Sequence, residues 1–138
     1  MNVAGQPYRT VWMEGAVVRM IDQPLLPYRF AITDLPTHRH TAEAITTMVV
    51  RGAGAIGAAA GYGMAQVALE APDGAAFMDY VLQGAERLRN TRPTAQDLFY
   101  AIERVLAAIQ AAGSAPQARR AAVETAQRLA DENAAAGE

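Results

Sequence analysis

The 138-residue sequence contains no cysteine and no lysine. The first absence excludes disulfide scaffolds, thiolate nucleophiles and cysteine-based zinc sites within this chain. The second excludes a Schiff-base mechanism and the lysine of a phosphate-binding loop. All 12 basic residues are therefore arginines. Any anion that the chain binds has to be held by guanidinium groups and backbone amides, both of which suit phosphate.

The sequence also lacks a large excess of positive or negative charge and a long uninterrupted apolar run. The net charge is −2, so no broad basic field favours nucleic acid or an anionic membrane. The longest uncharged apolar run, residues 52–69, is broken by glycines and is shorter than the roughly 20 residues of a membrane span. We expect it to be a buried helix. Residues 1–10 are polar and lack the apolar stretch of a secretory signal, so a cytoplasmic protein is expected.

The pattern of apolar residues divides the chain into two parts. Short β-branched and aromatic runs predict strands at 10–13, 16–21 and 28–33. After residue 35, apolar spacing and turn residues predict helices over about 42–50, 55–69, 75–88, 93–112 and 116–133. We expect one α+β domain that is mostly α. A small three-stranded antiparallel sheet (1–35) would precede a bundle of about five helices (36–138).

Two helices of this bundle have well-defined predicted core faces. The predicted core face of the third helix consists of Phe77, Val81, Leu82, Ala85 and Leu88. That of the fourth consists of Leu98, Ile102, Val105, Leu106 and Ile109.

Three glycines form the pattern G-x-G-x-x-G at positions 52, 54 and 57, which resembles a dinucleotide-binding fingerprint. Asp73 even lies near the distance at which a ribose-binding acid is expected. The preceding segment nevertheless has helical spacing, and Arg51 occupies the position of a strand's last apolar residue. No strand candidate follows, and a parallel sheet needs several. The sequence therefore disfavours a nicotinamide cofactor, and we expect no cofactor.

The same loop has the features of an oxyanion or phosphate cradle. Gly52 and Gly54 allow a ligand to approach the backbone closely. The helix predicted to begin near residue 55 directs free N–H groups and its positive end toward this loop, beside Arg51. Arg92 stands at a second predicted helix start, next to Pro93. Two arginines at two helix starts predict a site in which both hold one sugar phosphate.

A purely structural alternative remains open for these residues. The glycines of the second helix can serve tight helix packing, and the two arginines can pair with Asp34, Asp73 or Asp97. His38 and His40 form an H-x-H pair, but a metal needs two further ligands that the spacing does not supply. The adjacent threonines favour a helix start there, and we expect no metal. No serine–histidine–aspartate set is visible, so the chain offers half a binding site and no complete catalytic group set.

Three motifs, in order along the chain, resemble the methylthioribose-1-phosphate isomerase family. Residues 48–57 read Met-Val-Val-Arg-Gly-Ala-Gly-Ala-Ile-Gly, followed at 58–65 by Ala-Ala-Ala-Gly-Tyr-Gly-Met-Ala. Residues 92–95, Arg-Pro-Thr-Ala, resemble that family's second arginine motif. Asp22 and Gln23, with Leu26 and Pro27, resemble its early segment. The resemblance thus covers nearly the whole chain.

The resemblance implies that Arg51, Gly52, Ala53 and Arg92 bind the substrate. The implied reaction interconverts 5-methylthioribose 1-phosphate and 5-methylthioribulose 1-phosphate in methionine salvage, without a cofactor. In the family, the catalytic cysteine and aspartate lie in a second, larger α/β domain, and this chain is expected to end before it. We therefore expect no catalytic residue in this chain and no turnover unless a partner chain supplies the rest. The complete protein is expected to be a homodimer.

One departure from the family pattern leaves the sugar open. Gly54 stands where the family usually has proline, and glycine there resembles isomerases that act on ribose 1,5-bisphosphate. The same fold also serves as a non-catalytic assembly module in regulatory subunits of initiation factor 2B. The Arg51 and Arg92 motifs favour the isomerases over that module.

Overall fold

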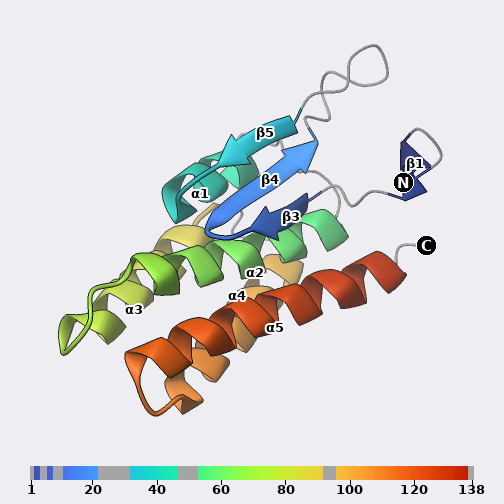
Figure 1. Ribbon diagram of the computed structural model, residues 1–138. Helices are drawn as coiled ribbons and strands as arrows, with labels where there is room; N and C mark the ends of the chain where they lie inside the picture. The colour runs from blue at the N-terminus through green and yellow to red at the C-terminus, as the bar shows by residue number, and fades with distance from the viewer. Residues whose placement is uncertain are drawn as a thin grey trace.

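The computed structural model describes residues 2–3, 6–7, 11–21, 32–46, 53–91 and 96–136. Within them the chain forms two small antiparallel sheets and five helices (Figure 1). Their bounds are β1 Asn2–Val3, β2 Gln6–Pro7, β3 Val11–Glu14, β4 Val17–Ile21, β5 Ile32–Leu35, α1 His38–Thr46, α2 Ala53–Glu70, α3 Ala76–Arg89, α4 Gln96–Ala111 and α5 Ala115–Ala136. The predicted α+β class, a three-stranded antiparallel sheet followed by helices, is confirmed.

The three-stranded sheet has the order β3–β4–β5 and one face toward the helices. Met13 pairs with Val18 and Val18 with Leu35, so the three side chains share one face. Val18 and Leu35 are buried, and Met13 packs against the same core. The β3–β4 turn uses Gly15, whose φ of 60° favours glycine.

The opposite face of the sheet carries one arginine that pairs with two carboxylates. Arg19 pairs across the strands with Trp12 and Asp34. Its guanidinium lies 2.9 Å from a carboxylate oxygen of Glu14 and 3.2 Å from one of Asp34. Arg19, the one arginine in strands β3, β4 and β5, is thus paired with carboxylates of the sheet itself.

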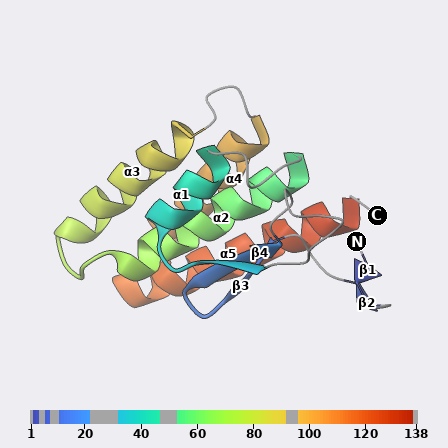
Figure 2. The ribbon, with the colours of Figure 1, turned by 90° about the horizontal axis from the view of Figure 1, so that it is seen from above.

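Helix α2 is the centre of the molecule. Every residue from Ile56 to Ala68 is buried, as expected for the long apolar run. The sheet and α1 cover α2 on one side, and α4 and α5 cover it on the other (Figures 1 and 2). Glycine and alanine dominate this helix, so its neighbours approach its backbone closely.

Several boundaries differ from the sequence prediction. The third strand extends to Leu35, two residues beyond its predicted end, because Leu35 is buried in the core and Asp34 pairs with Arg19. The β1–β2 hairpin was not predicted. Leu82 was assigned to the core face of α3 but is 45% exposed, since it is one position round the helix from Val81. Residues 28–31 and 47–50, at the predicted strand start and helix end, lie outside the described residues.

Gly84 lies where α3 crosses α2. A Cβ atom added there would lie 2.6 Å from both methyl carbons of Val67, which is fully buried. We expect Gly84→Ala to lower the free energy of unfolding by about 2 kcal/mol, because the two helices have to move apart. This loss should exceed the gain of about 1 kcal/mol that alanine brings to a helix interior.

Gly61 provides the matched control, to be measured in the same urea denaturation experiment. A Cβ there would meet Leu129 at 3.4 Å, an ordinary contact distance. Gly61→Ala should therefore leave the stability unchanged or raise it. Equal losses in the two variants would contradict the packing that the structure shows.

Candidate functional site

The first residues of α2 and α4 lie at the same end of the helix bundle (Figures 1 and 2). Helix α5 runs antiparallel to α2: Leu129 lies beside Gly61, and Arg119 reaches the carbonyl oxygens of Ala68 and Ala71. Helices α4 and α5 form a hairpin and are also antiparallel. Helix α4 is consequently parallel to α2, and the two helix starts face the same way.

This end of the bundle combines two positive helix termini. The first N–H groups of each helix have no partner within the helix, and the helix dipole places partial positive charge there. Of the predicted substrate-binding residues, Ala53 is the first residue of α2. Arg51, Gly52 and Arg92 lie outside the described residues. In the sequence, Arg51 stands two residues before α2 and Arg92 four before α4. The binding roles of the residues outside the described ranges stay predictions.

Two of the three acidic residues that could have paired with these arginines pair with others. Asp34 lies 3.2 Å from Arg19, and Asp73 lies 2.6 Å from Arg119. The same Arg119 donates to two carbonyl oxygens at the end of α2, so it caps that helix. Asp34 and Asp73 thus have partners among the described residues, whereas the pairing of Arg51 and Arg92 lies outside them.

The dinucleotide interpretation also lacks its structural context. Asp73 follows the C-terminal end of α2, and the 18 residues of that helix place it about 25 Å from the glycine pattern. Ranges 53–91 and 96–136 contain helices and connecting turns without a strand. Within these ranges there is therefore no second strand of a βαβ unit.

A cluster of polar side chains that the sequence analysis missed links α1, α2 and α3. His38 is fully buried, and its Nδ1 atom lies 2.6 Å from Oε1 of Glu70. Glu70 also accepts hydrogen bonds from the backbone N–H of His38, at 2.8 Å, and from the Tyr80 hydroxyl, at 2.8 Å. On its other side, His38 Nε2 lies 2.7 Å from Arg87 Nη1. The cluster lies at the C-terminal end of α2, away from the two helix starts.

One signal in the sequence could have revealed the cluster. His38, Ala42 and Ile45 recur at helical spacing, and all three are buried. The predicted role of this segment as a helix start is confirmed, because Thr37 Oγ1 accepts a hydrogen bond from the His40 N–H and caps α1. The H-x-H pair is divided between two environments, since His40 is exposed and contacts Thr37.

The cluster changes the titration of two of its members. Burial would raise the pKa of Glu70, but the hydrogen bonds from His38 and Tyr80 outweigh it and lower that pKa below its ordinary value. Burial and the hydrogen bond to Glu70 raise the pKa of Tyr80. Glu70 is therefore an ionised acceptor, and Tyr80 is a neutral donor.

Replacing Glu70 with glutamine is expected to remove part of the protein's sensitivity to acid. A lowered carboxyl pKa stabilises the fold above the pKa of the unfolded chain, and this contribution is lost as the pH falls through the folded-state pKa. The variant should lose about 1 kcal/mol of stability at pH 7. Its free energy of unfolding should then fall less steeply than that of the wild type below about pH 5. Urea denaturation across this range measures both slopes, and Glu124→Gln, at an exposed position, should keep the wild-type slope.

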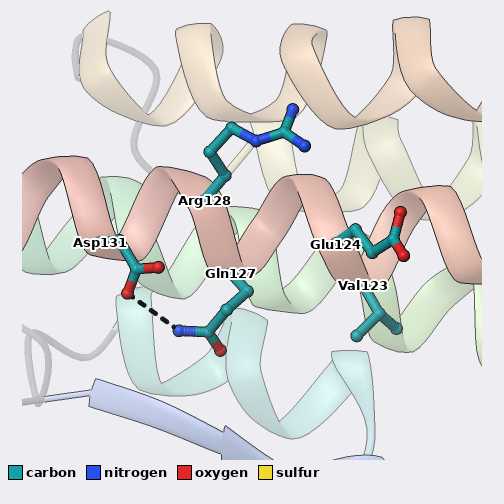
Figure 3. Close-up of a pocket in the computed structure, with 5 residues that line it drawn as sticks. All are labelled: Val123, Glu124, Gln127, Arg128 and Asp131. Atoms are coloured by element: carbon teal, nitrogen blue, oxygen red, sulfur yellow. Dashed lines mark hydrogen bonds between the residues drawn. The ribbon is translucent and has the colours of Figure 1, made fainter.

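The described surface also has a hollow on α5 that does not have the features of a ligand site. A shallow hollow of about 410 Å³ lies on α5 and is lined by Val123, Glu124, Gln127, Arg128 and Asp131 (Figure 3). Gln127 donates to Asp131 at 3.1 Å and accepts from Tyr62 at 3.2 Å. A single helix supplies all five lining residues, and no group in the hollow points to a ligand.

In the part of the chain that the structure describes, no group of three or more histidine, aspartate or glutamate side chains is arranged to hold a metal ion. None of the helices in that part combines the length and apolar character needed to cross a membrane.

Comparison with known proteins identifies the family. The sequence profile described as the Initiation factor 2 subunit family matches residues 49–138. Methylthioribose-1-phosphate isomerase from Picosynechococcus sp. is 41% identical over 128 residues, which cover 91% of this chain and 37% of that protein. The crystal structure of 5-methylthioribose 1-phosphate isomerase from Pyrococcus horikoshii OT3 matches with a TM-score of 0.84 and 39% identity, over 90% of this chain and 36% of that one.

A second solved structure has a different description. Subunit delta of translation initiation factor eIF-2B from A. fulgidus matches with a TM-score of 0.85 and 33% identity, over 91% of this chain and 37% of that one. The chain thus spans little more than a third of the length of the relatives it matches. The family profile covers well over half of the chain, and the starts of α2 and α4 lie within the matched residues. The chain belongs to the Initiation factor 2 subunit family.

Proposed function

We propose that this chain is the substrate-binding N-terminal part of an aldose–ketose isomerase. The substrate would be 5-methylthioribose 1-phosphate, and the product 5-methylthioribulose 1-phosphate. The observation that carries the proposal is that α2 and α4 begin at the same end of the bundle, each shortly after an arginine in the sequence. Relatives named methylthioribose-1-phosphate isomerase, at about 40% identity, support the choice of reaction.

The chemistry of the substrate explains why phosphate binding matters. A phosphate on C1 blocks spontaneous opening of the sugar ring, so the enzyme has to open the ring before hydrogen moves between C1 and C2. That sequence needs a general acid, a general base and a site that excludes water and holds the phosphate firmly. Arg51 and Arg92 would hold the phosphate through guanidinium forks, and the free N–H groups beginning at Ala53 would add to them.

The acid and the base would come from the remainder of a longer protein. The chain has no cysteine or lysine, and the cluster around His38 lies at the far end of α2 from the proposed phosphate site. The last turns of α5 lie at the same end of the bundle as the start of α2 (Figure 1). A following domain connected there would begin beside the proposed site. The complete protein would be a cytoplasmic homodimer of the methionine salvage pathway.

Two other functions remain candidates. Gly54 keeps ribose 1,5-bisphosphate open as the sugar. The match to subunit delta from A. fulgidus supports a non-catalytic assembly module, because its TM-score equals that of the isomerase within 0.01. The arginines before α2 and α4 favour the isomerase.

An activity assay tests the proposal. The isolated chain should not convert either sugar phosphate. The chain joined to the C-terminal remainder of the Picosynechococcus relative should convert 5-methylthioribose 1-phosphate. Turnover by the isolated chain would contradict the proposal that the catalytic acid and base lie outside it. A folded but inactive hybrid, beside an active relative measured in parallel, would favour the assembly module.

A further inference from the structure

We propose that His38 is a proton-controlled switch that holds Arg87 when it is neutral and releases it when it is protonated. The switch concerns the junction of α1 and α3 and is independent of the proposed phosphate site. It is carried by the hydrogen bonds on the two sides of one buried imidazole ring.

The two hydrogen bonds assign the tautomer of His38. Arg87 Nη1 lies 2.7 Å from His38 Nε2. A guanidinium group has donors only, so Nε2 has to be the acceptor and carries no proton. The ring proton is therefore on Nδ1, which donates to Glu70 at 2.6 Å. Because Glu70 is ionised, the neutral ring lies between an anion on α2 and a cation on α3.

Protonation affects these two contacts in opposite ways. The added proton goes to Nε2, which then becomes a donor facing a second donor of the same charge at hydrogen-bond distance. Arg87 can leave, because its side chain is only partly buried and long enough to reach water. On the other side, the hydrogen bond from Nδ1 to Glu70 comes to join two opposite charges and becomes stronger. One contact is lost while the other strengthens, so we expect the fold to persist.

The charged and titratable groups around the ring come from each neighbouring element. Glu70 belongs to α2, Tyr80 and Arg87 belong to α3, and Arg39 follows the histidine on α1. The Tyr80 ring stands edge-on to the imidazole, with ring centres 6.1 Å apart, and its hydroxyl donates to Glu70.

The charged group of β5 does not join this cluster. Asp34 is paired with Arg19 on the opposite side of the sheet. Among the described groups that contact the ring, Arg87 is thus the cation that protonation would displace.

Nitrogen-15 NMR of the whole chain tests this switch between about pH 8 and pH 5, the range in which histidine side chains change charge. At the upper pH, long-range proton–nitrogen spectra should show His38 with its proton on Nδ1. On acidification, the Arg87 side-chain signals should shift together with those of His38, toward positions typical of solvent-exposed arginine. Backbone signals of the α4–α5 core, such as those of Ile102 and Leu129, should stay in place.

Two variants separate this effect from general acid sensitivity. In His40→Gln, which removes the exposed histidine of the same helix, the Arg87 shift should be unchanged. In His38→Gln, the amide offers an NH2 donor group and a carbonyl acceptor but does not titrate, so the Arg87 shift should disappear. If this variant does not fold, the wild-type tautomer and the His40→Gln titration decide the matter. A proton on Nε2 at pH 8, Arg87 signals that ignore the titration of His38, or loss of the whole fold with it would overturn the proposal.

Discussion

Replacing Gln66 with leucine is expected to lower the free energy of unfolding by about 3 kcal/mol. Gln66 lies in the middle of the bundle on α2 and is 1% exposed. Its Nε2 donates to the carbonyl oxygens of Ala16, at 3.0 Å, and Leu35, at 2.7 Å. Its Oε1 accepts from the Thr41 hydroxyl at 2.5 Å. One side chain thus ties the sheet and α1 to the central helix.

The size of the expected loss follows from the groups that the substitution leaves behind. Leucine fills nearly the same volume but satisfies none of the three partners, and each buried polar group without a partner costs about 1–3 kcal/mol. The matched control is Gln83→Leu, at an exposed position of α3, which should change stability by less than about 0.5 kcal/mol. Urea denaturation followed by far-ultraviolet circular dichroism measures both variants. A loss below 1 kcal/mol for Gln66→Leu would mean that these hydrogen bonds do not hold the sheet on the bundle.

The second large effect concerns Arg92. In the protein joined to a catalytic remainder, Arg92→Ala is expected to lower kcat/KM at least about 100-fold, equivalent to about 3 kcal/mol of lost transition-state stabilisation. The proposed reason is the loss of a bidentate contact to the substrate phosphate near the start of α4. Arg92→Lys should recover little of it, because a single ammonium group cannot replace a planar fork. Arg51→Ala should behave in the same way at the start of α2.

Arg120 supplies the control for these substitutions. It is an exposed arginine near the start of α5, at the other end of the bundle from the proposed site. Arg120→Ala should leave kcat/KM within about twofold of the wild type. The steady-state assay of the joined protein is the measurement, with circular dichroism to show that each variant is folded. A full recovery in Arg92→Lys would contradict a forked phosphate contact.

The helices were predictable because most of them have an apolar face at helical spacing, and α2 has a long apolar run. The core face predicted for α4, with Leu98, Ile102 and Ile109 among its members, is buried in the structure. The described starts of α2 and α3 lie within two residues of their predicted positions, since Gly74 and the run of small residues mark them clearly. The family motifs then indicated a function that periodicity alone does not give.

The contacts around His38 and Gln66 were not predictable in the same way. Glu70 lies 32 residues from His38, and Arg87 lies 49 residues from it. Such pairs form only when three helices have packed, and no local pattern encodes which partner a buried polar group will find. Leu82 shows the converse, because an apolar residue next to a core face can still point into water. The binding roles of Arg51, Gly52, Ala53 and Arg92 stay predictions.

The most direct test of the account is an amide-resolved NMR titration of the chain with 5-methylthioribose 1-phosphate, and separately with unphosphorylated methylthioribose and with NAD. Only the sugar phosphate should shift the signals of Arg51 to Gly57 and of the residues around Arg92. Those of α5 near Arg120 should not move. Equal shifts with the unphosphorylated sugar, or shifts in the glycine segment with NAD alone, would contradict a phosphate-binding site at the two helix starts.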